Sequence, residues 1–230
     1  MTSHTAPMAA SEPPPPVART ITIGSQHLEG ILVTPASSIG LVIFAHGSGS
    51  SRFSRRNTFV AERLQKVGFA TLLFDLLTPD EAQDRTNVFD IPLLSDRVVE
   101  AIATARLDLA TRDLPIGLFG ASTGAAAVLI AAALSPDEVT AVVSRGGRPD
   151  LATGHLDRVR SPTMLIVGGA DHEVIKLNRA AMKQMTCVKG LRIIKGAGHL
   201  FEEQGMLEEV INDALFWFCS HMDVSAIDKF

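Results

Sequence analysis

The chain has 230 residues, of which 46% are hydrophobic and 20% charged, and its formal net charge at pH 7 is −4. This apolar content is enough to form a hydrophobic core, so the composition excludes a chain that is disordered throughout. The near-neutral balance argues against nucleic acid or a membrane surface as the partner. The longest apolar stretch is too short to span a bilayer.

The amino-terminal residues differ in composition from the rest of the chain. They include four successive prolines, Pro13 to Pro16, and we predict a disordered Pro-rich tail over 1–18, followed by a single domain over 19–230. The tail lacks the apolar core of a signal peptide and the arginines of a transit peptide. Cys187 and Cys219 lie far apart without metal-ligand spacing, so we expect a cytoplasmic protein with reduced, buried cysteines.

Beyond the tail, short β-rich runs alternate with helical patterns. The first two runs are separated by a short turn and predict an antiparallel hairpin, whereas the later strand–helix alternation predicts parallel pairing through crossovers. This order indicates an α/β fold with an eight-stranded, mostly parallel sheet, an antiparallel N-terminal strand and helices on both faces. The expected strands are 21–24, 28–33, 41–45, 70–74, 116–119, 140–144, 164–167 and 191–195, and the expected helices are 58–67, 94–110, 123–134, 174–185 and 203–220.

The fifth expected strand leads into the sequence Gly120-Ala121-Ser122-Thr123-Gly124. A G-x-S-x-G motif between a strand and a helix is typical of a nucleophile elbow, in which a strained turn exposes the serine. Glycines suit the two outer positions because side chains there would collide with the neighbouring strand and helix. We therefore predict that Ser122 is a nucleophile.

A serine nucleophile needs a base and an acid that orients the base. Asp171 follows the seventh expected strand and His199 follows the eighth, so the chain order Ser122, Asp171, His199 places all three at one edge of the sheet. Glu173 remains an alternative acid. His172 adjoins Asp171 and points elsewhere, so His199 is the predicted base.

Acyl transfer also needs donors for the oxyanion. We predict the backbone N–H of Thr123, directly after the nucleophile, and that of Ser48, in the glycine-rich loop after the third strand. His46 precedes this loop and is expected to brace it. No nucleotide-binding glycine motif and no metal-ligand cluster occurs in the sequence, so no cofactor is expected.

Together these motifs resemble the α/β-hydrolase superfamily, and its small, lidless dienelactone hydrolase-like branch in particular. The segments 119–126 and 144–151 are similar to hydrolase domains that some bacterial proteins join to a phosphoribosyltransferase. The resemblance implies the fold and the Ser122, Asp171 and His199 triad. It does not extend to the nucleophile of dienelactone hydrolases proper, which is a cysteine.

Two segments bear on the substrate. The stretch between Ser144 and Ser161 is too short for a lipase-type lid, and 76–92 is the expected wall or flap of a small pocket. Arginines follow the third and sixth strands, and guanidinium groups bind carboxylates and phosphates. We therefore hypothesise an anionic substrate group held by Arg145, against the alternative that these arginines are solvated or pair with neighbouring aspartates.

The sequence thus predicts a serine hydrolase that cleaves a small ester, thioester or lactone through an acyl-enzyme. Two alternatives stay open: a non-catalytic ligand-binding or sensor protein on the same fold, and an acyltransferase or perhydrolase, which shares the acyl-enzyme but uses another acceptor.

Overall fold

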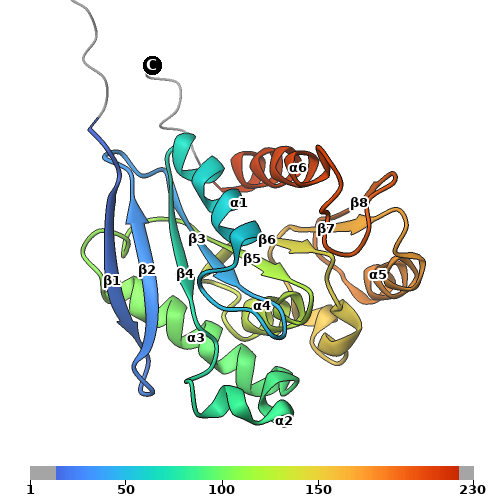
Figure 1. Cartoon of the computed structure of the whole chain (residues 1–230), viewed down its shortest axis with the longest axis horizontal. Helices are drawn as coiled ribbons and strands as arrows, with labels where there is room; N and C mark the ends of the chain where they lie inside the picture. Colours follow the sequence, from blue (N-terminus) through green and yellow to red (C-terminus); the bar gives the residue numbers. More distant parts are fainter. Residues whose placement is uncertain (1–13, 223–230) are drawn as a thin grey trace, which may run out of the picture.

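The computed structural model describes residues 14–222 and contains one eight-stranded sheet in the order β1-β2-β4-β3-β5-β6-β7-β8 (Figure 1). Strand β2 is antiparallel to both β1 and β4, and every later pair of neighbours is parallel. The strands are β1 Val17–Ile23, β2 Leu28–Thr34, β3 Gly40–Ala45, β4 Phe69–Phe74, β5 Ile116–Ala121, β6 Val139–Arg145, β7 Thr163–Gly168 and β8 Lys189–Ile194.

Helices cover both faces of the sheet (Figure 1). Helices α1 and α6 pack on one face over a core that includes Phe44, Phe119 and Phe218, and α3, α4 and α5 pack on the other. The α-helices are α1 Arg55–Lys66, α2 Arg85–Val88, α3 Ile91–Leu107, α4 Thr123–Leu134, α5 His172–Gln184 and α6 Met206–His221; the 3₁₀ helices are η1 Glu81–Gln83, η2 Pro149–Ala152 and η3 Leu156–Arg158.

The central strands β3, β4 and β5 are buried at every position. This explains their continuous apolar sequences, because a strand covered on both faces has no side that favours polar residues. Each parallel strand ends at the same edge of the sheet, and the loops that follow β3, β5, β7 and β8 therefore meet there. The predicted fold class is confirmed.

The amino-terminal boundary differs from the prediction. Strand β1 begins at Val17, which pairs with Thr34, and Ala18 pairs with Val33. Two residues assigned to the tail thus belong to the sheet, because the ladder with β2 continues beyond the apolar part of the sequence. Residues 1–13 of the predicted tail and residues 223–230 of the predicted domain lie outside the described residues.

Cys187 and Cys219 are free, but both are half-buried rather than fully buried as expected. Burial raises the pKa of each thiol. Within residues 14–222, no helix combines the length and apolarity needed to cross a bilayer.

Candidate active site

Ser122 lies on a sharp turn between β5 and α4. Its φ is 53° and its ψ is −118°, a backbone conformation that residues with a side chain rarely adopt. Three backbone hydrogen bonds hold this conformation: the Ser122 N–H donates to the Arg145 carbonyl, and the Ser122 carbonyl accepts from the N–H groups of Ala125 and Arg148, each at 3.1 Å. The neighbouring structure therefore enforces the strain that a nucleophile elbow requires.

The glycines on either side of Ser122 permit close packing. A Cβ on Gly124 would lie 2.4 Å from the carbonyl oxygens of Ala45 and His46, and a Cβ on Gly120 would lie 2.5 Å from the Ala125 Cα. The steric reason for the motif is thus visible in the structure: α4 begins directly against the end of β3. No larger residue fits without displacing the loop that carries Ser48.

The loops after β7 and β8 are tied to each other. The Ala170 N–H donates to the Ala197 carbonyl at 2.9 Å, and the Gly169 N–H donates to the Ile194 carbonyl at 2.7 Å. A Cβ on Gly168 would lie 2.3 Å from the Gly198 carbonyl oxygen, so the two loops are as close as their backbones allow. This contact brings Asp171 and His199 together.

Ser122, His199 and Asp171 form a continuous chain of contacts. The Asp171 Oδ2 lies 2.6 Å from the His199 Nδ1, and the His199 Nε2 lies 3.4 Å from the Ser122 Oγ. Asp171 begins α5 but makes no side-chain cap there, which leaves its carboxylate for the histidine. The alternative acid Glu173 is 80% exposed and bonds Lys176, and its neighbour His172 is also exposed.

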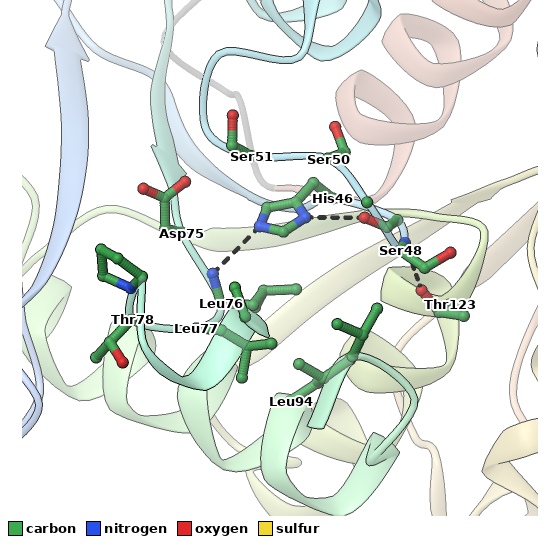
Figure 2. A pocket seen from close by; sticks show the side chains of 15 residues that line it. His46, Ser48, Ser50, Ser51, Asp75, Leu76, Leu77, Thr78, Leu94 and Thr123 are labelled. Atoms are coloured by element: carbon green, nitrogen blue, oxygen red, sulfur yellow. Dashed lines mark hydrogen bonds between the residues drawn. The ribbon is translucent and has the colours of Figure 1, made fainter. Parts of the chain in front are cut away.

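The two residues predicted to supply oxyanion donors are adjacent at this edge. The Ser48 N–H, however, donates to the Thr123 Oγ1 at 2.9 Å (Figure 2). The prediction assumed that this N–H would be free to face a substrate. That N–H instead donates to the side chain of Thr123, whose own backbone N–H is the second predicted donor.

His46 braces the loop, as expected. Its Nδ1 lies 3.0 Å from the Gly47 carbonyl oxygen and its Nε2 accepts the Leu76 N–H at 3.2 Å (Figure 2). An Nε2 that accepts and an Nδ1 that donates define the neutral imidazole. Burial lowers the pKa of His46, outweighing the opposing effects of the Gly47 carbonyl and of Asp75, and so favours the same state.

A cavity of about 360 Å³ opens beside this loop. Ser48 and Thr123 line the cavity at one end. Gly47 also lines it, and a Cβ on Gly47 would lie 3.0 Å from the Ser122 Cβ. Half of the remaining lining residues belong to the segment 76–92, which the sequence predicts as a pocket wall, and Leu94 lies just beyond that segment (Figure 2). The apolar members of this wall are Leu76, Leu77, Pro79, Ala82, Val88 and Leu94.

The arginines near this edge have individual partners. Arg52 bonds Asp75 and Glu29, Arg56 bonds Glu202, and Arg148 bonds Asp150. These three arginines therefore form structural ion pairs, as the alternative expected, but Arg56 pairs with a glutamate rather than with an aspartate.

Arg145 differs from the others. It is only 7% exposed and does not belong to the lining of the cavity. Its Nη2 donates to the Asn57 Oδ1 at 3.3 Å, while its Nε and Nη1 have no partner among the described residues. Burial and the nearby Arg56 lower the pKa of Arg145 to about 10. Its role as a substrate contact stays a prediction.

Sequence reasoning missed the residues that hold the His199 loop. The Gly198 N–H donates to the Glu203 Oε1 at 2.9 Å, and Arg56 of α1 donates to the Glu202 Oε1 at 2.7 Å. Phe201 is buried with a φ of 56°. The only signal for these roles was the position of two acidic residues shortly after the predicted base.

The chain has an α/β-hydrolase fold. The features that define it are the strand order, the strained serine after β5, and the loops after β7 and β8 that carry Asp171 and His199. The family model of the dienelactone hydrolase family matches residues 28–213. The chain belongs to this family.

Two solved structures illustrate the similarity. A dienelactone hydrolase from Anabaena variabilis is 49% identical, with a TM-score of 0.87 over 92% of this chain and 100% of that one. A lidless α/β serine hydrolase from Xanthomonas campestris shares the fold, with 19% identity and a TM-score of 0.72 over 94% and 99% of the two chains.

A putative phosphoribosyl transferase from Mycobacterium tuberculosis is 51% identical over 202 residues, which are 88% of this chain and 46% of that protein. The chain thus spans about half the length of this curated relative.

Proposed function

We propose that this protein is a serine hydrolase that cleaves a small ester, thioester or lactone through an acyl-enzyme on Ser122. The observation that carries the proposal is the contact chain from Asp171 through His199 to the Ser122 Oγ. The 3.4 Å contact between His199 and Ser122 is long for a hydrogen bond, as is common in catalytic sites without substrate.

In the proposed reaction the His199 Nε2 accepts the Ser122 proton while the Oγ attacks the substrate carbonyl carbon. Asp171 holds the imidazole with its Nδ1 protonated and stabilises the imidazolium that forms. The leaving group departs with the proton from His199. Water, deprotonated by the same histidine, then releases the acyl group and restores Ser122.

The cavity supports a small substrate with an apolar part. Its size suits a short acyl or alcohol group, and the leucines and Pro79 of its wall offer no charge to that group. Asp75 is the charged residue of the lining, and Arg52 bonds it. An apolar group beside Leu76 and Leu94 is therefore favoured over an anionic one, and the anionic substrate would require Arg145 to reach it.

A panel of neutral and carboxylate-bearing esters, thioesters and lactones tests the proposal. We expect wild type to hydrolyse short neutral esters and Ser122→Ala to lose the activity, with Glu173→Gln as the control that retains it. Added alcohol or hydrogen peroxide as a competing acceptor separates hydrolysis from acyl transfer or perhydrolysis. A folded wild type that binds these compounds without turnover would favour the binding-protein alternative.

A further inference from the structure

The hydrogen bond between Ser48 and Thr123 determines which donors face the cavity. The Ser48 N–H donates to the Thr123 Oγ1 at 2.9 Å. A substrate oxygen therefore cannot accept a hydrogen bond from that N–H unless the Thr123 side chain moves. Both residues line the cavity and the bond lies at its end (Figure 2). An oxyanion at this place therefore meets the Thr123 hydroxyl before it meets the Ser48 N–H.

A hydroxyl that accepts a hydrogen bond still has its own hydrogen to donate. In the part of the chain that the structure describes, the bond from Ser48 is the one hydrogen bond recorded for the Thr123 hydroxyl. The side chain is 5% exposed, and the cavity that it lines offers the open space for an acceptor. The hydroxyl hydrogen is thus available to a ligand in the cavity.

We infer that Thr123 is a catalytic residue, and that its side-chain hydroxyl donates a hydrogen bond to the oxyanion in place of the Ser48 N–H. The inference rests on the proposed function. The Ser48 N–H contributes indirectly, because a hydroxyl that accepts a hydrogen bond becomes a stronger donor. The backbone N–H of Thr123 supplies the second donor, so one residue provides both.

The step needs no proton from Thr123. The Ser122 Oγ forms a bond to the carbonyl carbon, the electron pair of the carbonyl π bond moves to the oxygen, and the Ser122 proton goes to the His199 Nε2. The Thr123 hydroxyl keeps its hydrogen and only shortens its contact as negative charge develops on the oxygen.

Substitution at residue 123 tests this role. Thr123→Val keeps the shape but removes the hydroxyl, and we expect kcat on a short neutral ester to fall about 10²–10³-fold, the usual effect of losing one oxyanion donor, with KM little changed. Thr123→Ser restores the hydroxyl and is expected to recover most of the lost rate. Thermal unfolding of both variants identifies any loss that comes from misfolding.

Two results overturn the inference. If Thr123→Val or Thr123→Ala matches or exceeds the wild-type kcat while KM is unchanged, the hydroxyl only covers the Ser48 N–H, and that N–H is the donor. If Thr123→Val raises KM with kcat unchanged, the hydroxyl binds ground state and transition state alike. Wild type and Ser122→Ala are compared first, because a wild type without Ser122-dependent turnover contradicts the proposed function itself, and the inference with it.

Discussion

Asp171 contacts His199 through one carboxylate oxygen at 2.6 Å, and its side chain is 17% exposed. A partly buried carboxylate in this position fixes which ring nitrogen of the histidine carries the proton. We therefore propose different roles for these two nearby acids, since Glu173 is 80% exposed and bonds Lys176 instead.

Asp171→Asn tests this assignment. We expect kcat to fall by about 10⁴-fold, because an amide favours the wrong histidine tautomer, while the fold is retained. The matched control is Glu173→Gln, which keeps the wild-type rate. If Glu173→Gln causes the loss and Asp171→Asn does not, the alternative acid is correct.

Arg145 carries a buried charge that no carboxylate among the described residues neutralises. A pKa lowered from 12.5 to about 10 corresponds to a cost of about 3 kcal/mol for keeping the guanidinium charged in the folded protein. Such a cost is expected where a cation is buried without a full set of hydrogen bonds.

We therefore predict that Arg145→Met raises the free energy of unfolding by about 1–3 kcal/mol, since an apolar side chain of similar length removes the buried charge. Urea denaturation of both proteins measures the change. A loss of stability on substitution would contradict a net cost for the buried charge. Equal effects on anionic and neutral esters would exclude it as a substrate contact.

Helix α4 begins against the end of β3, and this contact sets the position of the Ser48 loop relative to Ser122. Gly124→Ala places a Cβ 2.4 Å from two backbone oxygens, so we predict a loss of about 3 kcal/mol in unfolding free energy together with loss of turnover. Urea denaturation and ester hydrolysis measure the two effects.

Gly154→Ala is the matched control for backbone strain. Gly154 has a φ of 87° but no atom within 4 Å of a Cβ, so its substitution costs only the left-handed conformation, about 1–2 kcal/mol, and turnover is retained. Equal losses of stability and activity in the two variants would contradict a steric role for Gly124.

The sequence predicted the existence of every strand and of the five long helices, because each has a short β-rich run or a helical pattern. The sequence did not predict the strand order, in which β4 lies between β2 and β3, since the antiparallel pairing of β2 with β4 joins residues far apart in the chain. Helix α2 and the 3₁₀ helix η1 are short and polar, without a period that would identify them.

The same limit applies to the site. The proximity of Ser122, Asp171 and His199 could be predicted because a strand end places each of them at one edge. The contacts of Ser48 with Thr123 and of Arg56 with Glu202 could not, because each joins side chains on different loops. The burial of Arg145 could not be predicted from the sequence either, since an arginine at a strand end is more often exposed.

At the scale of the whole molecule, one sheet brings three loops that are distant in sequence to a single edge. The family match covers residues 28–213, which include all three residues of the contact chain and the cavity wall. All the residues on which the proposed function rests therefore lie within the part of the chain that matches the family.

The proposed function requires Ser122 to be an activated nucleophile. The most direct test is intact-protein mass spectrometry after treatment with a fluorophosphonate, which reacts with activated serines, on wild type and on Ser122→Ala. We expect a single adduct on wild type and none on the variant. A folded wild type that remains unmodified, or a variant that is labelled equally, would contradict it.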